Sequence, residues 1–212
     1  MAMGSGAFLV QACRYLSSRL AEAWDWHVVA VTTSLTALAV GYGGLTSYAA
    51  IFSRQQHITP DSLYFTFFAV TNALVRILTS HLGDRFGFRV VLYPSLLLVP
   101  VAFALLAFTT QRWEMILSAI IFGIGFGSAY PAFVTFVLAN TDAARRARTF
   151  GSIIWAFDTG IGTGSLVIGT IGAHYGLSNG FLAAAGVSGL ALPLFMLTSP
   201  FIARRGTSLA VS

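Results

Sequence analysis

The chain has 212 residues, of which 56% are hydrophobic and only 9% are charged. A soluble domain carries about 25% charged residues, so this composition excludes a cytosolic enzyme, a disordered chain and a nucleic-acid binder of the usual kind. The net charge of +5 comes from 12 arginines without any lysine, in short clusters between apolar runs, a pattern that sets membrane topology. Because the arginines are spread among the apolar runs, we expect no nucleic-acid partner. The single cysteine, Cys13, allows neither an intramolecular disulfide nor a cysteine cage for a metal. We expect no cofactor and no metal site.

Residues 1–26 are expected to form a cytoplasmic N-terminal segment. One helical face of this segment gathers Leu9, Cys13, Leu16, Leu20 and Trp24. This weak amphipathic pattern predicts a helix that lies along the cytoplasmic surface of the membrane. The alternative is a poorly ordered tail, because chain ends fray.

Residues 27–203 are predicted to form one domain with six membrane-spanning helices. A transmembrane helix needs about 20 apolar residues. Six such runs follow one another, at about 27–52, 62–82, 90–109, 114–138, 149–173 and 180–202. They are too long for strands and show no two-residue alternation. The expected fold is therefore an all-α six-transmembrane-helix bundle, followed by a cytoplasmic tail at 204–212.

Arginines are distributed unevenly between the two ends of these spans. Nine lie in the N-terminal segment, in the turns after the second and fourth spans, and in the tail: Arg14, Arg19, Arg85, Arg89, Arg145, Arg146, Arg148, Arg204 and Arg205. Only Arg54 and Arg112 lie on the opposite side, and Arg76 lies within the second span. Because arginine-rich loops remain in the cytoplasm, we predict that both termini are cytoplasmic, in a plasma or bacterial inner membrane.

The six spans repeat a pattern of three. The first and fourth spans are expected to be interrupted by glycine, at Gly41, Gly43 and Gly44 and at Gly123, Gly125 and Gly127 with Pro131. The second and fifth spans each carry one charged residue within the membrane, Arg76 and Asp158, and the third and sixth carry none. The bundle is therefore expected to consist of two three-helix units. Corresponding glycine-interrupted spans are the best sequence indication of a transporter's substrate site.

The two ionisable residues within the spans, Asp158 and Arg76, are the main candidates for substrate binding or ion coupling. They lie roughly 14 Å and 10 Å inside the membrane at about 1.5 Å per residue, where a charge costs about 2.5–3.5 kcal/mol. In the functional interpretation, Asp158 accepts a proton or another cation. Arg76 is then its counter-charge, directly or through water, or an anchor for an anionic substrate. The alternative is a structural ion pair that locks the second span to the fifth.

Polar and aromatic side chains in the same spans add further candidates. Asn72 lies one turn before Arg76, and Ser80 lies one turn after it, so the three form a stripe that faces the bundle interior or an aqueous cavity. The alternative for this stripe is hydrogen bonding between helices. Three tyrosines beside the glycines are candidates for substrate contact, and ordinary packing is the alternative for each: Tyr42, Tyr48 and Tyr130.

The fifth span carries small residues on the face of Asp158. Gly151, Gly162, Ser165 and Gly169 share that face, and small residues let helix backbones approach closely. Close packing is one interpretation, and a rocking surface between two halves is the other. Trp155, one turn before Asp158, has no clear place in either interpretation.

The turn after the second span, with the sequence Gly-Asp-Arg-Phe-Gly-Phe-Arg at 83–89, resembles the major facilitator superfamily signature. The match holds at Asp84, Arg85, Gly87 and Arg89, whereas the family prefers Gly at position 80 and a base at position 90. The fifth span resembles the family's glycine-rich motif through Gly160, Gly164 and Ser165. Residues 123–140 and 145–151 resemble the fourth and fifth helices of a C-terminal half in efflux-type members.

The resemblance covers 27–203 and implies one six-helix half of a twelve-helix transporter. It implies secondary active transport of a small solute by alternating access. Protons are a candidate coupling ion because Asp158 could accept them. It also implies that Asp84, Arg85, Gly87 and Arg89 form a conformational gating loop. The alternative is a solvated basic turn. Because the family's cavity lies between two halves, we expect a second six-helix half or a homodimer as partner. The alternative function is a non-transporting membrane scaffold or a partner half that works only with another chain.

Overall fold

The structure, a computed structural model, describes residues 26–86, 88–141 and 143–198, with side chains described at 32–78, 90–141 and 143–198. Six long helices follow one another, together with one short 3-10 helix. Their bounds are α2 Trp26–Gln55, α3 Leu63–Phe86, α4 Phe88–Ala107, α5 Arg112–Ala139, η1 Ala143–Arg145, α6 Arg146–Tyr175 and α7 Leu177–Gly189. After a turn at Leu190, residues 191–198 are helical again. The surface helix predicted within 1–26 and the tail at 204–212 lie outside the described residues, apart from Trp26.

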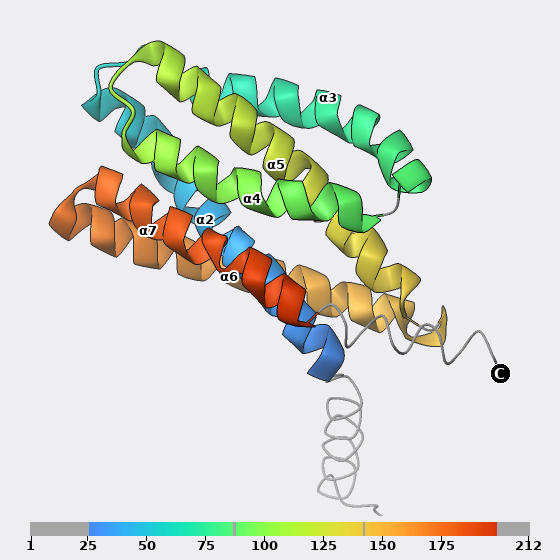
Figure 1. The fold of residues 1–212 in the computed structure, drawn as a ribbon. Helices are drawn as coiled ribbons and strands as arrows, with labels where there is room; N and C mark the ends of the chain where they lie inside the picture. The colour runs from blue at the N-terminus through green and yellow to red at the C-terminus, as the bar shows by residue number, and fades with distance from the viewer. Residues whose placement is uncertain (1–25, 87, 142, 199–212) are drawn as a thin grey trace, which may run out of the picture.

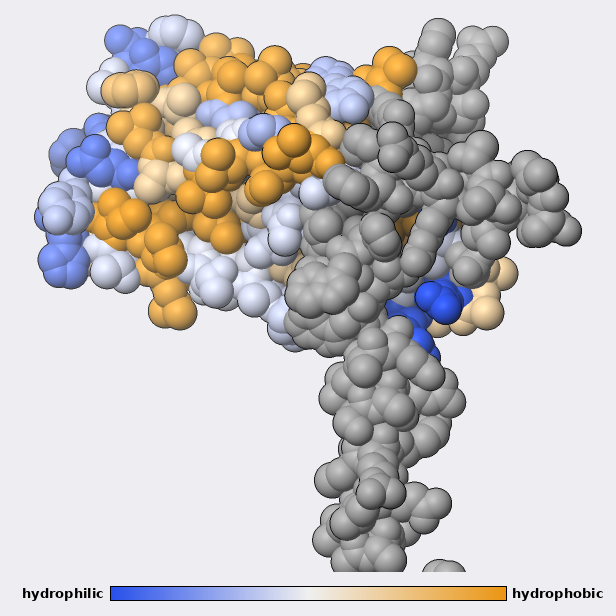
Figure 2. Space-filling view, turned by 60° about the horizontal axis from the view of Figure 1, so that its bottom comes forward, coloured by the Kyte–Doolittle hydropathy of each residue, from blue (hydrophilic) through white to orange (hydrophobic). Residues whose placement is uncertain are grey.

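The prediction of an all-α membrane bundle is confirmed. Within the described residues no strand occurs, and five helical segments are long and apolar enough to cross a membrane. The apolar part of α3, Leu63–Leu78, is shorter. Figure 2 shows apolar surface over much of one face of the bundle, with hydrophilic residues gathered at its left end, as expected for a chain whose middle contacts lipid.

The turns lie at two opposite ends of the bundle. The α2–α3, α4–α5 and α6–α7 turns are at the left end in Figure 1, and the α3–α4 and α5–α6 connections are at the right end. Arg54 and Arg112 therefore lie at one end, and Arg145 and Arg146 lie at the other. This is the separation of arginines that the sequence predicts. The side of the membrane on which each end lies stays a prediction.

The helix pairs follow the expected division into two three-helix units. If α2, α3 and α4 form the first unit and α5, α6 and α7 the second, the first helix of each unit packs against the second helix of the other, as α2 with α6 and α5 with α3. The third helices, α4 and α7, also pack together. The two units are thus interleaved rather than side by side, and α3 and α6 lie on opposite sides of the bundle (Figure 1).

The prediction that glycines interrupt the first and fourth spans is wrong, because α2 and α5 are continuous helices through all of them. Pro131 also lies inside α5 without ending it. The glycines instead allow close approach between helices. A Cβ added at Gly43 would collide with the backbone of Ile161 on α6, and one added at Gly164 would collide with the backbone of Val40 on α2.

The core contains many aromatic rings and few polar side chains. Seven aromatic side chains are fully buried: Phe52, Tyr64, Phe103, Phe122, Phe133, Phe181 and Phe195. Several buried hydroxyl groups form hydrogen bonds within their own helix or across helices, whereas those of Ser34 and Tyr64 have no partner in the described part of the chain. The hydroxyls of Ser95 on α4 and Ser128 on α5 lie 2.7 Å apart, and Ser118 on α5 donates to the carbonyl of Ala102 at 2.8 Å. Such contacts position α5 firmly against α4.

Candidate functional site

An aromatic cluster occupies the place where α2, α3, α5 and α6 meet. Tyr42 on α2 stacks on Phe126 of α5 with ring centroids 4.5 Å apart and an interplanar angle of 11°. Phe68 of α3 and Phe157 of α6 approach the Tyr42 ring to 6.2 and 6.1 Å. Tyr130 joins from α5, with its ring 5.0 Å from that of Phe157. The structure therefore brings the predicted residues Tyr42 and Tyr130 to one cluster.

The phenylalanines of this cluster were not identified from the sequence. The chain contains 18 phenylalanines, and no periodic pattern separates these from the rest in helices that are apolar on every side. The one available signal was proximity, since Phe126 lies one turn before Tyr130 and Phe157 directly precedes Asp158.

Tyr48 lies apart from the aromatic cluster. A Cβ added at Gly169 on α6 would collide with the Tyr48 hydroxyl, so this ring packs across the α2–α6 contact. Nearby, Ser165 donates to the carbonyl of Gly43 at 3.0 Å, and its hydroxyl lies 2.9 Å from that of Ser47. These contacts agree with the packing alternative for Tyr48, and its role in substrate contact stays a prediction.

Asn72 and Arg76 lie one turn apart on α3 in different surroundings. The Oδ1 of Asn72 is buried and has no hydrogen-bond partner in the described part of the chain. It lies against α5, where a Cβ added at Gly127 would be 2.6 Å away. Arg76 is exposed, and no hydrogen bond or ion pair is found for it among the described residues. Ser80 lies outside the described side chains.

Asp158 is exposed on α6, on the other side of the bundle from Arg76. It lies 12 residues after the first residue of α6, about 18 Å along the helix axis. Arg76 lies 10 residues before the last residue of α3, about 15 Å from the same end of the bundle. Both charges are thus near mid-depth, as the sequence predicts.

Asp158 and Arg76 form no direct ion pair in the described part of the chain, so the alternative of a structural ion pair between the second and fifth spans is wrong. Their helices, α6 and α3, do not pack together, because α2 and α5 lie between them. Within the described residues the ion pair that forms is instead between Arg54 and Asp61, and Asp158 makes neither a hydrogen bond nor an ion pair. Each mid-depth charge is therefore exposed on the surface of this six-helix unit, without a partner among the residues that the structure describes.

The residues of the predicted gating loop belong mostly to helices. Asp84 and Arg85 lie in the last turn of α3, and Arg89 lies in the first turn of α4. Gly87 and all four side chains lie outside what the structure describes. The connection is thus a single residue between two helices rather than an extended loop, and the gating role stays a prediction.

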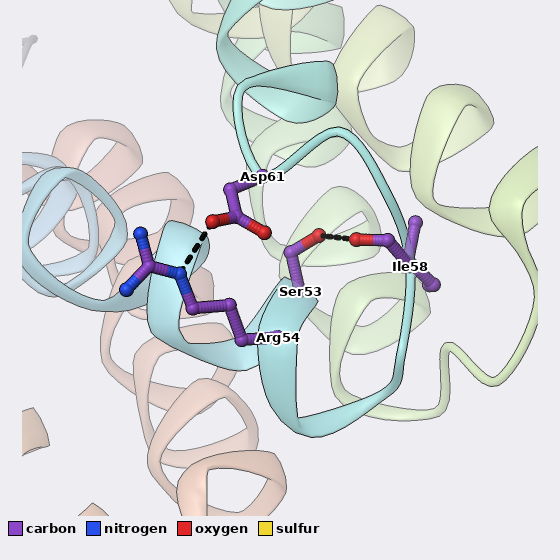
Figure 3. A network of polar contacts seen from close by, with 4 residues as sticks. All are labelled: Ser53, Arg54, Ile58 and Asp61. Carbon is purple, nitrogen blue, oxygen red and sulfur yellow. Dashed lines mark hydrogen bonds and ion pairs between the residues drawn. The ribbon is translucent and has the colours of Figure 1, made fainter.

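The opposite end of the bundle carries an ordered turn between α2 and α3 (Figure 3). Ser53 is buried and donates to the carbonyl of Ile58 at 2.7 Å, while Arg54 pairs with Asp61 at the surface. Arg112 at the start of α5 donates to the hydroxyl of Thr59 at 3.4 Å. These contacts tie the ends of α2, α3 and α5 together. Across the described ranges, no three His, Cys, Asp or Glu side chains gather in a group that could hold a metal ion.

Comparisons with known proteins agree with this architecture. The sequence profile of the Major Facilitator Superfamily matches residues 29–208. The class C tetracycline resistance protein of Escherichia coli is 37% identical over 113 residues, which are 53% of this chain and 28% of that protein. A solved structure described as an auto-inhibited POT family peptide transporter superposes with a TM-score of 0.69 at 18% identity, over 82% of this chain and 37% of the other. This last likeness concerns the fold alone. The matched part thus spans about a third of each relative's length.

Proposed function

Since the chain belongs to the Major Facilitator Superfamily, as the match over residues 29–208 establishes, we propose that it acts as one six-helix half of a secondary active transporter for a small solute. The family consists of membrane transporters, and the chain is an integral membrane protein with five segments of spanning length in its described part. The matched portions of the two relatives are about a third of their lengths. Transport is therefore assigned to an assembly in which this unit pairs with a second six-helix half or with a second copy of itself.

The observation that supports this proposal most directly is the exposure of Asp158 and Arg76 near mid-depth. A charge that faces lipid at the bilayer centre costs about 2.5–3.5 kcal/mol, so such residues border water or protein. Neither residue has a partner in the described part of this unit. Because α3 and α6 lie on opposite sides of this unit, a second half satisfies both charges only if it reaches both helices and borders them with water or polar groups.

In the proposed mechanism, Asp158 accepts a proton or another cation, and Arg76 with Asn72 anchors an anionic or polar group of the solute. Tyr42 and Tyr130 contribute aromatic surface from the cluster, and Tyr48 is a weaker candidate because it packs against Gly169. Binding shifts the equilibrium between inward-open and outward-open states. Asp84, Arg85, Gly87 and Arg89 are proposed to stabilise one of these states.

We place both termini in the cytoplasm, in a plasma or bacterial inner membrane. Arg54 and Arg112 lie at one end of the bundle, and the other end carries Arg85, Arg89, Arg145, Arg146 and Arg148, a bias that supports this orientation. A tag on the C-terminus should react with an impermeant reagent only after the cells are opened. Labelling in intact cells would overturn the orientation.

Everted membrane vesicles test the transport proposal. Because the Escherichia coli relative is named for tetracycline resistance, tetracycline is the first probe, and proton exchange is followed by the recovery of a quenched pH-gradient dye. Vesicles with the wild-type chain should show recovery. Asp158→Asn should abolish it at equal abundance of folded protein. Asp61→Asn removes a carboxylate outside the membrane core and should behave as wild type.

The length of the matched region also supports a second possibility, in which this unit has no transport activity alone. If tetracycline and other solutes cause no recovery with the chain alone but do so after co-expression with a second six-helix half, the chain is a partner half. If recovery is absent in both cases, the chain is a membrane scaffold. Exchange by Asp158→Asn at the wild-type rate would contradict the role given to that residue.

A further inference from the structure

Trp155 and Asp158 stand together on the exposed side of α6, and the transport mechanism above leaves Trp155 without a role. We propose that these two side chains form a binding site for an organic cation, a compound with a quaternary or protonated centre and apolar substituents. The assignment of such a cation as a transported solute rests on the proposed function. The site itself is defined by the geometry of α6.

The spacing places the two side chains next to each other. Residues three apart on a helix are neighbours on its surface, and helical side chains lean toward the N-terminus. Asp158 and Trp155 therefore share one face of α6. Trp155 is 64% exposed, and Asp158 is also exposed.

The helix surface on both sides of this pair is bare. Gly151 lies one turn before Trp155, and Gly162 lies one turn after Asp158. A Cβ added at either glycine would meet nothing within 4 Å. An indole and a carboxylate thus project from an open strip of helix, with room for a bulky group on either side.

The position of Trp155 distinguishes it from an interfacial anchor. It lies 9 residues inside α6, about 14 Å from the helix end, whereas interfacial tryptophans lie at helix ends. Trp113 is the comparison within the chain, since it occupies the second position of α5 and donates from Nε1 to the Oε1 of Gln111 at 2.7 Å. Trp155 makes no such bond within the described residues.

The chemistry of the pair selects an organic cation. The face of an indole attracts a cation, most strongly where water is excluded, and the unpaired carboxylate supplies the opposite charge. A metal ion needs several oxygen or nitrogen ligands, but no group of three candidate ligands is found in the described part of the chain. A proton alone would make no use of the indole, and the carboxylate would repel an anion.

Equilibrium binding of two probes to the purified full chain in detergent tests the site. Tetraphenylphosphonium and tetraphenylborate have nearly the same size and shape and opposite charges. A difference between their saturable binding therefore reports the charge that the site requires, whereas partition into the detergent micelle is not saturable. The wild-type chain should bind tetraphenylphosphonium saturably and should not bind tetraphenylborate saturably. Absence of tetraphenylphosphonium binding, or equal binding of both probes, would overturn the proposal.

Substitutions identify the residues. Asp158→Asn should weaken tetraphenylphosphonium binding by about tenfold or more, as loss of an attractive charge at close range implies. Trp155→Leu should weaken it by about threefold to thirtyfold, and Trp155→Phe by less, because tryptophan is the best cation–π partner. Trp113→Leu and Asp61→Asn are the matched controls and should bind as wild type. Unchanged binding by either Asp158→Asn or Trp155→Leu would overturn the assignment.

Two further comparisons keep the test decisive. If Asp158→Asn does not fold, Asp158→Glu, which keeps the charge, should retain most of the binding, and Trp155→Leu still tests the indole. Loss of binding in both controls would also overturn the proposal. Binding is measured without transport, so the two proposals can fail separately. Asp158-dependent proton exchange without tetraphenylphosphonium binding refutes this site alone, while binding with the expected variant effects and no exchange refutes transport alone.

Discussion

The contact between α2 and α6 gives the sharpest prediction for stability, because two glycines on α6 differ only in what they face. Gly164 lies against the backbone of Val40, with which an added Cβ would collide, while Gly162 faces open space. In a helix interior, replacing Gly with Ala is favourable by about 0.5–1 kcal/mol where space allows. Overpacking a close contact costs about 1–3 kcal/mol, and here backbone rather than a flexible side chain must move.

Because both variants gain the same helix propensity, Gly164→Ala should be less stable than Gly162→Ala by the overpacking cost alone, about 1–3 kcal/mol. For a chain of this size, 1 kcal/mol corresponds to about 2–4 °C in Tm, so the two midpoints should differ by about 2–12 °C. The assay is loss of the monodisperse elution peak after heating detergent-solubilised protein. Both variants make the same chemical change two residues apart on one helix, so helix propensity and detergent effects cancel.

Equal midpoints for the two variants would refute the described α2–α6 contact. Gly151→Ala extends the control, since an added Cβ at this position also meets nothing within 4 Å. It should behave as Gly162→Ala. Destabilisation by all three substitutions to the same degree would mean that α6 is packed on every side, which contradicts its exposed face.

Three further predictions concern side-chain contacts, and the same thermal assay measures each. Ser53→Ala should cost about 1–3 kcal/mol of stability, because it leaves the buried carbonyl of Ile58 without its donor. Asp61→Asn should cost at most about 1 kcal/mol, because its ion pair with Arg54 is exposed. A larger loss in Asp61→Asn than in Ser53→Ala would contradict the turn geometry. Phe126→Ala should cost about 3–5 kcal/mol as the central ring of the aromatic cluster is lost, and a neutral result would remove that cluster. Ser95→Ala and Ser128→Ala should each cost only about 0.6 kcal/mol, because each hydroxyl has one proton and can donate it to a carbonyl of its own helix instead of to the other serine, and a loss above about 2 kcal/mol in either would contradict this description.

Composition and length were sufficient to predict the class of fold. A 20-residue apolar run has few alternatives to a spanning helix, because the bilayer core offers no hydrogen-bond partner to a backbone N–H or C=O group that is unpaired within the protein. The arginine count also predicted which turns share an end, and the structure agrees for Arg54 and Arg112 against Arg145 and Arg146. Both inferences depend on the lipid and water that surround the chain, and neither requires knowing which side chains contact each other.

The membrane environment also explains why the prediction that glycines interrupt the first and fourth spans is wrong. In water, a run such as 123–127 with three glycines weakens a helix because the backbone can bond to solvent instead. In lipid no such competitor exists, so α5 continues through Gly123, Gly125 and Gly127. The glycines signal where helices approach closely: an added Cβ at Gly123 would lie 2.8 Å from Thr71 on α3, and one at Gly125 would lie 3.1 Å from Leu98 on α4.

The candidate site was only partly accessible from the sequence. Depth follows from counting residues along a helix, so the mid-depth positions of Arg76 and Asp158 were predictable. The pairing of helices was not, because in an apolar bundle the faces toward lipid and toward protein have similar hydropathy. The interpretation of Asp158 and Arg76 as a structural ion pair is wrong for this reason, since nothing in the sequence indicates that α2 and α5 separate α3 from α6.

In the interleaved arrangement, Arg76 and Asp158 both need a neighbour other than lipid. Arg76 and Asp158 occupy the corresponding second helices of the two three-helix units, and those helices lie on opposite sides of the bundle. Facing lipid, the two charges together would cost about 5–7 kcal/mol. That is as large as the entire net stability of many folded domains, which is about 5–15 kcal/mol. A six-helix unit with both charges exposed is therefore stable in a membrane only where water or another protein borders both α3 and α6, and a second half that reaches both helices provides that border.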